Sequence, residues 1–521
     1  MKKFSTSKKI ILATLCTSIL FPIFTTAHAK PYKSNTDTGT DIFDYIENRR
    51  RERRANELTD EQKKLLADIA ENKERLPHAV DENAPIPAVF EGDDMIYNTA
   101  TGEFTAVGKV DIIQLDGHRF QSEKATGNTK TQDIFIEDKG HVLQLTKGAP
   151  RVTLDGYHTV YNYGTKMGTM DSATGKYGEY YISGKRFEFY PDHIVVRDAT
   201  QTKCNAKNPD YHLSSERMEI WPEQIIRMYN VKLWIKDKVV GKKAYEERTM
   251  DDAGENYFPS VGYDKNHGAY ISDTFELFHT KDNHFSGVLN AYIESKKGVR
   301  SNAEAYYRNR NVEGNIYYGY YCDSNDNWIM KEPSLELKYL KHFPTLPLTY
   351  LFQYEVGRWK DNRNKTLHQR AEIGLYHDPI VLFKNYYLLL HASYTLTRDN
   401  VRSATPKYTN DVNGFNYDIT LGREFNDRLA MFTGYHFTKN NSKNSMFDYG
   451  NDSYSKKLQA GVSYRITPLD RVVAGVSYNM EDSSLQDVDY YWFHDLHCST
   501  AVIRWRQKRK QWGFQWQFTP W

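Results

Sequence analysis

After its first 30 positions, the 521-residue sequence has no run of 18 or more apolar residues, which excludes a transmembrane helix from the mature chain. Hydrophobic residues make up only 39% of the chain, and its mean hydropathy is −0.72. Both values are too low for a helical membrane protein. They are compatible with a β-barrel, because a barrel strand exposes an apolar side chain to lipid only at every second position.

Patterns that carry catalysis or cofactor binding are also scarce. There is no Gly-rich phosphate loop, and a net charge of +2 without a strong basic motif predicts no nucleic-acid partner. His391 and Ser393 share one face of a predicted strand, as a serine hydrolase would need, but serine is so common in these strands that coincidence explains the pair better. His494, His497 and Cys498 are compact metal donors without a second cluster at zinc spacing, which favours an ordinary loop.

We therefore predict no enzymatic activity, no cofactor and no metal site. An enzyme that modifies membrane lipids is kept as an alternative hypothesis. Loss of activity in His391→Ala or Ser393→Ala would support it.

Residues 1–29 have the pattern of an export signal. Four lysines lie within the first nine positions, an apolar core covers residues 10–24, and Ala27-His28-Ala29 forms a small-x-small cleavage site. The mature chain is therefore predicted to start near Lys30 and to work outside the cytoplasm.

Cysteine is rare, with four residues in the chain. Cys16 lies inside the export signal and is expected to leave with it. Cys204, Cys322 and Cys498 remain, and an odd number in an oxidising compartment permits one disulfide and one free thiol.

The second half of the sequence alternates strictly between apolar and polar residues. Residues 458–466, 472–480 and 512–518 each place apolar side chains on one face and small or polar ones on the other. Strands of about 9–11 residues with aromatic ends and polar loops are typical of an outer-membrane barrel, although a soluble sandwich alternates similarly. We predict a C-terminal antiparallel transmembrane β-barrel over residues 254–521, with about 14–16 strands, in the cell outer membrane.

Residues 30–87 form a polar lead. Thr59 and Gln62 have the spacing of a capping box, which predicts a short helix through residues 65–70. The arginine-rich segment 49–54 precedes it. We interpret that segment as a solvated linker face, with contact to anionic lipid head groups or a partner as the alternative.

Residues 88–240 contain short strands with an internal repeat. Gly108 and Gly140 occupy matching places 32 positions apart, and Tyr97 and Tyr161 are separated by twice that distance. Such a period marks a supersecondary unit whose copies stack to bury their apolar faces. Stacked hairpins with one apolar interior form an open β-jelly-roll or β-taco that can hold acyl chains, whereas an ordinary dry sandwich core gives the same alternation.

The motifs of this segment resemble those of a known family. The run from Tyr97 through Thr101-Gly102 to Gly108 is similar to the OstA-type domain of lipopolysaccharide-transport proteins. Cys204 with residues 209–220 resembles the segment that closes this domain in the LptD/OstA family of outer-membrane lipopolysaccharide-assembly proteins, and residues 257–263 resemble the passage into the barrel. The match covers roughly residues 88–300, and the order of the motifs along one exported chain is its specific feature.

The resemblance implies an all-β protein. An OstA-like periplasmic domain at 88–240 would receive lipopolysaccharide, and the barrel would insert the glycolipid into the outer leaflet. The implied partners are a periplasmic OstA-type bridge protein, an outer-membrane lipoprotein plug and the barrel-assembly machinery. The barrel predicted here is smaller than those of the family, which leaves less lumen for a plug. An outer-membrane diffusion porin with an accessory periplasmic domain is the alternative.

Two sets of site residues follow. In the family, disulfides tie the periplasmic domain to the C-terminal part of the barrel, which implies a Cys204–Cys498 pair with Cys322 free; Cys322–Cys498 or no disulfide are the rivals.

The predicted lipid-binding residues alternate along their strands and should share one interior. They are Val110, Ile112, Ile134, Ile136, Phe187, Phe189, Ile194, Val196, Met218 and Ile220.

Overall fold

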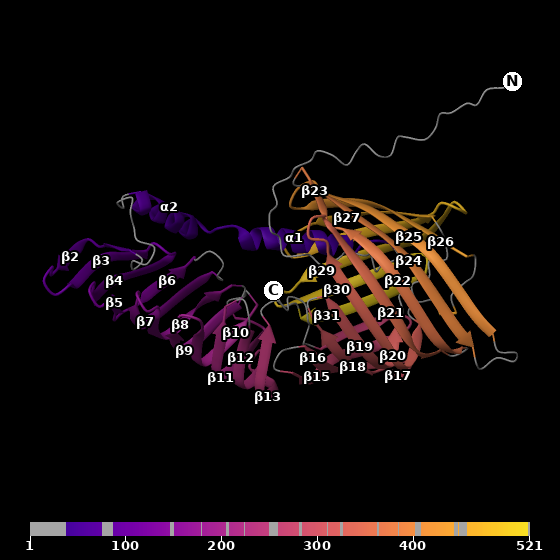
Figure 1. The fold of residues 1–521 in the computed structure, drawn as a ribbon, viewed down its shortest axis with the longest axis horizontal. Coiled ribbons are helices and arrows are strands. Elements are labelled where there is room, and N and C mark those ends of the chain that lie inside the picture. The colour runs from indigo at the N-terminus through magenta and orange to yellow at the C-terminus, as the bar shows by residue number, and fades with distance from the viewer. Residues whose placement is uncertain are drawn as a thin grey trace, which may run out of the picture.

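The computed structural model describes residues 38–74 and 87–518, apart from gaps at 146–150, 179, 205–207, 223–224, 250–258, 281–283, 310, 323–326, 362–363, 384, 402–407, 442–445 and 448–455. The export signal and its cleavage site lie outside the described residues. Within them, no helix has the length and apolar character needed to cross a membrane. The described chain forms two helices, one large open sheet and one closed barrel (Figure 1).

The two helices lie in the N-terminal segment. They are α1 (Ile42–Asn56) and α2 (Asp60–Glu74). The predicted capping box opens α2, because the Thr59 backbone N–H donates to Gln62 Oε1 at 3.1 Å and the Gln62 N–H donates to Thr59 Oγ1 at 3.2 Å. Leu65 and Ile69 pack on the outer face of the open sheet.

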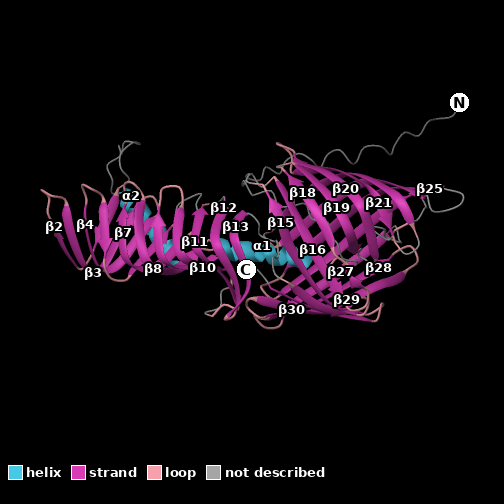
Figure 2. Ribbon diagram, turned by 90° about the horizontal axis from the view of Figure 1, so that it is seen from below, coloured by secondary structure: helices cyan, strands magenta, loops and turns pink. Residues whose placement is uncertain are grey.

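The open sheet has thirteen antiparallel strands, and Figure 2 shows them side by side along the long axis of the molecule. Its main path runs β1-β3-β4-β5-β7 and then in sequence to β13, with β2 paired to β3 and β6 paired to β4 and β7. The strands are β1 (Ala88–Glu91), β2 (Asp94–Tyr97), β3 (Glu103–Gln114), β4 (His118–Asn128), β5 (Asp133–Ile136), β6 (Gly140–Gln144), β7 (Val152–Asn162), β8 (Met167–Tyr177), β9 (Tyr180–Phe189), β10 (Ile194–Thr202), β11 (Tyr211–Trp221), β12 (Ile225–Ile235) and β13 (Lys238–Thr249).

Most of the long strands of this sheet bend at one point. Positive φ angles of 46–55° occur in the middle of β3, β7, β8, β10 and β12, at Lys109, His158, Ser172, Asp198 and Asn230. Three of these points, Lys109, His158 and Ser172, coincide with register shifts, and bulges of this kind bend a strand. We infer that the bends fold the sheet around one apolar interior, because most of the buried apolar side chains of β3 to β12 form a single cluster.

The barrel is closed and antiparallel, with β14 paired to β31. Eighteen strand segments build it, and β17 and β23 are short pieces beside direct β16–β18 and β22–β24 pairs, which leaves sixteen strands. This number is the upper end of the predicted range. The segments are β14 (Ser260–Asp264), β15 (Gly268–His279), β16 (Phe285–Glu294), β17 (Gly298–Val299), β18 (Asn302–Arg308), β19 (Val312–Cys322), β20 (Trp328–His342), β21 (Leu348–Lys360), β22 (Lys365–His377), β23 (Ile380–Leu382), β24 (Tyr386–Val401), β25 (Tyr408–Glu424), β26 (Leu429–Asn440), β27 (Lys456–Arg465), β28 (Asp470–Asn479), β29 (Ser484–Asp495), β30 (Ser499–Arg506) and β31 (Gln511–Phe518).

The outer wall of the barrel carries exposed apolar side chains. Ile271, Ile293, Ile316, Ile373 and Trp512 are 46–63% exposed and come from strands around the barrel. The opposite face of the same strands carries buried polar groups such as Glu294 and Glu372. An apolar exterior with a polar interior is the arrangement of an outer-membrane barrel, and we assign this part of the chain to that membrane.

Candidate functional site

The ten predicted lipid-binding residues all lie in the apolar interior of the open sheet. Nine of them are at most 8% exposed, and Phe189 is partly buried against the same cluster. Burial in this interior lowers the pKa of His118, beside Tyr161, to about 4. The buried side chains pack on one another, for example Phe120 on Tyr161 with ring centroids 4.9 Å apart. Lipid binding itself stays a prediction.

A disulfide joins the open sheet to the barrel. Cys204, just beyond β10, is bonded to Cys498 in the turn between β29 and β30, 294 positions away, and Cys322 is not in a disulfide. This is the pair that the family resemblance implied. The bonded cysteines are buried with Tyr211 against Trp516 of β31. The end of the open sheet is therefore fixed beside the last strand of the barrel.

The seam between β14 and β31 has the fewest paired residues of the sixteen strand junctions in the described barrel. Four residue pairs hold it, from Val261 opposite Trp516 to Asp264 opposite Gly513, whereas β30 and β31 share eight. A short ladder costs less free energy to open than a long one. The disulfide thus places one end of the open sheet next to a short junction of the barrel wall. The other junction of β14, with β15, is also short and has five residue pairs.

Helix α1 lies in the barrel mouth nearest the open sheet (Figures 1 and 2). Its apolar side chains Ile42, Phe43 and Ile46 are at most 2% exposed and pack on the inner wall, for example on Phe432 with ring centroids 5.3 Å apart. The sequence-based interpretation of segment 49–54 as a solvated face is wrong for Arg50. This residue is 6% exposed because it lies between the helix and the wall.

Ion pairs fix α1 to the wall at three points. The Arg50 Nε donates to Glu424 Oε1 at 3.1 Å, and Arg53 also pairs with Glu424. Arg465 lies 2.6 Å from Glu47. Further along, Arg471 of β28 lies 3.1 Å from Asp44. The pairs of Arg50 with Glu424 and of Arg465 with Glu47 are largely buried, whereas Asp44 and Arg53 are exposed. Together with the apolar contacts they place α1 against the inner wall, and we treat the helix as a candidate plug.

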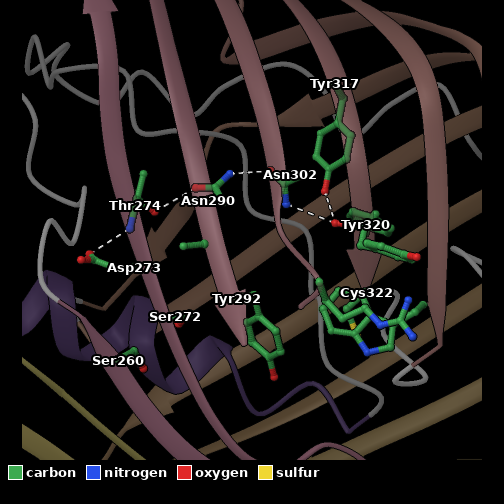
Figure 3. Close-up of a pocket in the computed structure, with 14 residues that line it drawn as sticks. Ser260, Ser272, Asp273, Thr274, Asn290, Tyr292, Asn302, Tyr317, Tyr320 and Cys322 are labelled. Carbon is green, nitrogen blue, oxygen red and sulfur yellow. Dashed lines mark hydrogen bonds between the residues drawn. The ribbon is translucent and has the colours of Figure 1, made fainter. Parts of the chain in front are cut away.

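A polar cavity of about 410 Å³ lies along β14–β19 and the start of β20 (Figure 3). Thr274 Oγ1 donates to Asn290 Oδ1 at 2.9 Å, and Asn290 Nδ2 donates to Asn302 Oδ1 at 2.8 Å. Tyr292 and Trp328 add aromatic faces. Hydroxyls, amides and aromatic rings are the groups that bind sugars, and these belong to the strands that follow the seam. The sequence did not indicate this cavity, because its residues come from six strands and form no motif.

The residues that the sequence suggested for catalysis or metal binding are not assembled into a site. His391 Nδ1 is 2.9 Å from Asp418 Oδ2, but His391 Nε2 and Ser393 Oγ have no hydrogen-bond partner in the described structure, so the serine and histidine are not paired. His494 bonds Asp470 at 2.8 Å, and Cys498 is in the disulfide, which removes its thiolate from any metal cluster. No group of three metal ligands occurs among the described residues.

No protein-family model matches the chain, and no curated protein is similar to it. Among solved structures, a triple mutant of Rh. blastica porin is 10% identical, with 50% of this chain and 98% of that chain covered and a TM-score of 0.31. OmpF of Salmonella typhi, in complex with daunomycin, is 12% identical, with 50% and 96% covered and a TM-score of 0.27. The outer membrane channel DcaP of Acinetobacter baumannii is 9% identical, with 63% and 84% covered and a TM-score of 0.25. Likeness at this level says nothing about a substrate.

Proposed function

We propose that this chain is a short-barrel member of the LptD/OstA family that moves an amphipathic glycolipid of the lipopolysaccharide class to the outer leaflet of the outer membrane. One observation carries the proposal. The only disulfide in the described chain holds the end of a sheet with an apolar interior beside the shortest junction of a barrel whose mouth contains helix α1. Exposing each CH₂ of an acyl chain to water costs about 0.8 kcal/mol, so transfer needs a continuous apolar path.

The two parts of such a lipid match two environments. The acyl chains suit the apolar interior of the open sheet, which would lie in the periplasm, and the sugars suit the polar cavity near the seam. The sheet edge farthest from the barrel begins with β1, which pairs only with β3. An unpaired edge is the natural docking place for another sheet, so we assign the periplasmic OstA-type bridge protein to it. An inner-membrane energy source would act through that bridge.

Depletion of the protein tests the proposal directly. Newly made lipopolysaccharide should then fail to reach the cell surface, because the chain proposed to carry it into the outer leaflet is missing. Pulse labelling followed by surface immunodetection measures the delivery, with an unrelated outer-membrane barrel depleted as the control. Unchanged surface delivery would refute transport.

Site-specific photo-crosslinking tests the sheet interior. A photoreactive residue at Ile136 or Phe189 should label lipopolysaccharide, whereas one at Glu137 or Glu188 should not. Ile136 is 1% exposed, and the side chain of Glu137, the next residue along, is 87% exposed on the other side. Equal labelling from both faces would show that the interior is an ordinary dry core.

A diffusion channel is the second candidate function. Strand number favours it, since barrels of about 16–18 strands usually leave an aqueous channel. The helix inside the lumen opposes it. Steady ion conductance of the native protein, without lipopolysaccharide bound to the sheet domain, would favour the channel.

A further inference from the structure

A thiol, an imidazole and a carboxylate meet at one end of the polar cavity. Cys322 ends β19 and lines the cavity, with its Sγ 3.7 Å from His267 Nε2. His267 lies in the turn after β14, and its Nδ1 is 2.6 Å from Asp264 Oδ2. This is the order nucleophile, base and orienting acid that thiol-dependent acyl transfer requires. The sequence could not indicate it, because 55 positions separate the thiol from the imidazole.

The imidazole is held in a fixed position. Asp264 also accepts the His267 backbone N–H at 2.8 Å, so one carboxylate fixes both the turn and the ring. The ring makes edge contacts with Tyr292 and Trp328, at centroid distances of 6.3 and 5.7 Å. With its Nδ1 bound to a carboxylate, the ring keeps Nε2 toward the thiol as a proton acceptor.

A second feature points to chemistry at this place. Glu294, at the end of β16, is 3% exposed, and neither of its carboxylate oxygens has a hydrogen-bond partner in the described structure. Its Oε2 lies 4.0 Å from His267 Nε2. A buried carboxylate without hydrogen bonds is costly unless it faces a positive charge, and His267 supplies one once its Nε2 has taken the thiol proton.

We propose that Cys322 and His267 are catalytic residues of an acyl-transfer site, with Asp264 as a positioning residue, and that the substrate is an acyl ester of the transported glycolipid. The identity of the substrate rests on the proposed function. It adds a reaction to a chain for which sequence alone predicts none.

The reaction balances without an outside oxidant or reductant. His267 Nε2 takes the thiol proton while Sγ bonds to the ester carbonyl carbon, and the carbonyl electron pair moves to oxygen. When that pair returns, the carbon–oxygen ester bond breaks, and the leaving alkoxide takes the proton from Nε2. The acyl group is then a thioester on Cys322. Water, deprotonated by His267, releases it as a carboxylic acid and restores the thiol.

The test uses the purified full-length protein in detergent with p-nitrophenyl butyrate as the probe. We expect release of p-nitrophenolate, a butyryl adduct on Cys322 detected by mass spectrometry, and removal of that adduct by hydroxylamine. Cys322→Ser should lose the thioester. His267→Asn should slow acylation about a hundredfold or more, the usual contribution of a general base. Ser477→Ala, which changes a buried serine of β28 outside this cavity, should leave the rate unchanged.

Asp264→Asn distinguishes positioning from simple structural support. Loss of the carboxylate should move the pH–rate profile of acylation to lower pH, because the imidazolium loses its anionic partner. Heat-modifiable gel mobility and an intact Cys204–Cys498 bond show that each variant is folded. Three outcomes would each overturn the proposal. They are no adduct on Cys322, an unchanged rate in His267→Asn, and one equivalent of zinc held by Cys322 and His267. p-Nitrophenyl butyrate is soluble and reaches the site without transport. If surface delivery is normal but no adduct forms, only the acyl-transfer proposal fails and the transport proposal stands.

Discussion

Arg50→Glu should convert a closed barrel into an ion-conducting one. Arg50 lies between Glu47 and Glu424, at 2.9 and 3.1 Å, and all three side chains are at most 11% exposed. A glutamate there would bring three buried carboxylates together. Breaking a buried pair costs about 3–5 kcal/mol, which corresponds to a shift of roughly a hundred- to several thousandfold toward a displaced helix.

Conductance in planar bilayers measures the effect. Arg54→Glu is the matched control, because it makes the same charge change on an exposed face of α1. The double variant Arg50→Glu with Glu424→Arg should recover much of the closed state, since the Arg50–Glu424 attraction is restored in reverse. A folded Arg50→Glu barrel that stays closed would show that α1 is not the plug. Steady conductance of the unchanged protein would instead favour a diffusion channel.

The contrast between the barrel and its plug shows what a single sequence can reveal. A strand that separates lipid from lumen must alternate with period two, and residues 458–466 and 472–480 do so over their whole length, so the barrel was predictable. Only the first turns of α1 carry apolar residues, at Ile42, Phe43 and Ile46, and arginines follow. That pattern predicts a solvated helix face. The partner that buries Arg50 is Glu424, which lies 374 positions away in the sequence.

The sites differ in the same way. Alternation placed the ten apolar residues of the open sheet on one face, and burial in one cluster follows from it. The Cys204–Cys498 pair needed the family resemblance, because three cysteines alone permit several pairings. The polar cavity and the Cys322–His267 contact depend on which ends of the barrel strands lie close together. Such neighbours are fixed by strand register, which local residue patterns do not encode.

A disulfide across the seam should stop delivery of lipopolysaccharide to the cell surface. Tyr263 of β14 lies opposite Phe514 of β31, and both side chains face outward, 52% and 41% exposed. Cα atoms of opposing residues are about 4.5–5.5 Å apart, within the range that a disulfide spans. Tyr263→Cys with Phe514→Cys would therefore close the shortest junction covalently, and delivery should fall to the level of depleted cells.

The control shares one of the two substitutions. Ile503→Cys with Phe514→Cys links β30 to β31 at an equally opposed pair that does not cross the seam, so delivery should continue. A reductant should restore delivery in the seam variant, which separates locking from misfolding, provided that mass mapping shows the Cys204–Cys498 bond formed in both proteins. If the seam disulfide forms quantitatively and lipopolysaccharide still reaches the surface, the lipid leaves by another path. The proximity of the open sheet to β31 would then serve only to orient the two domains.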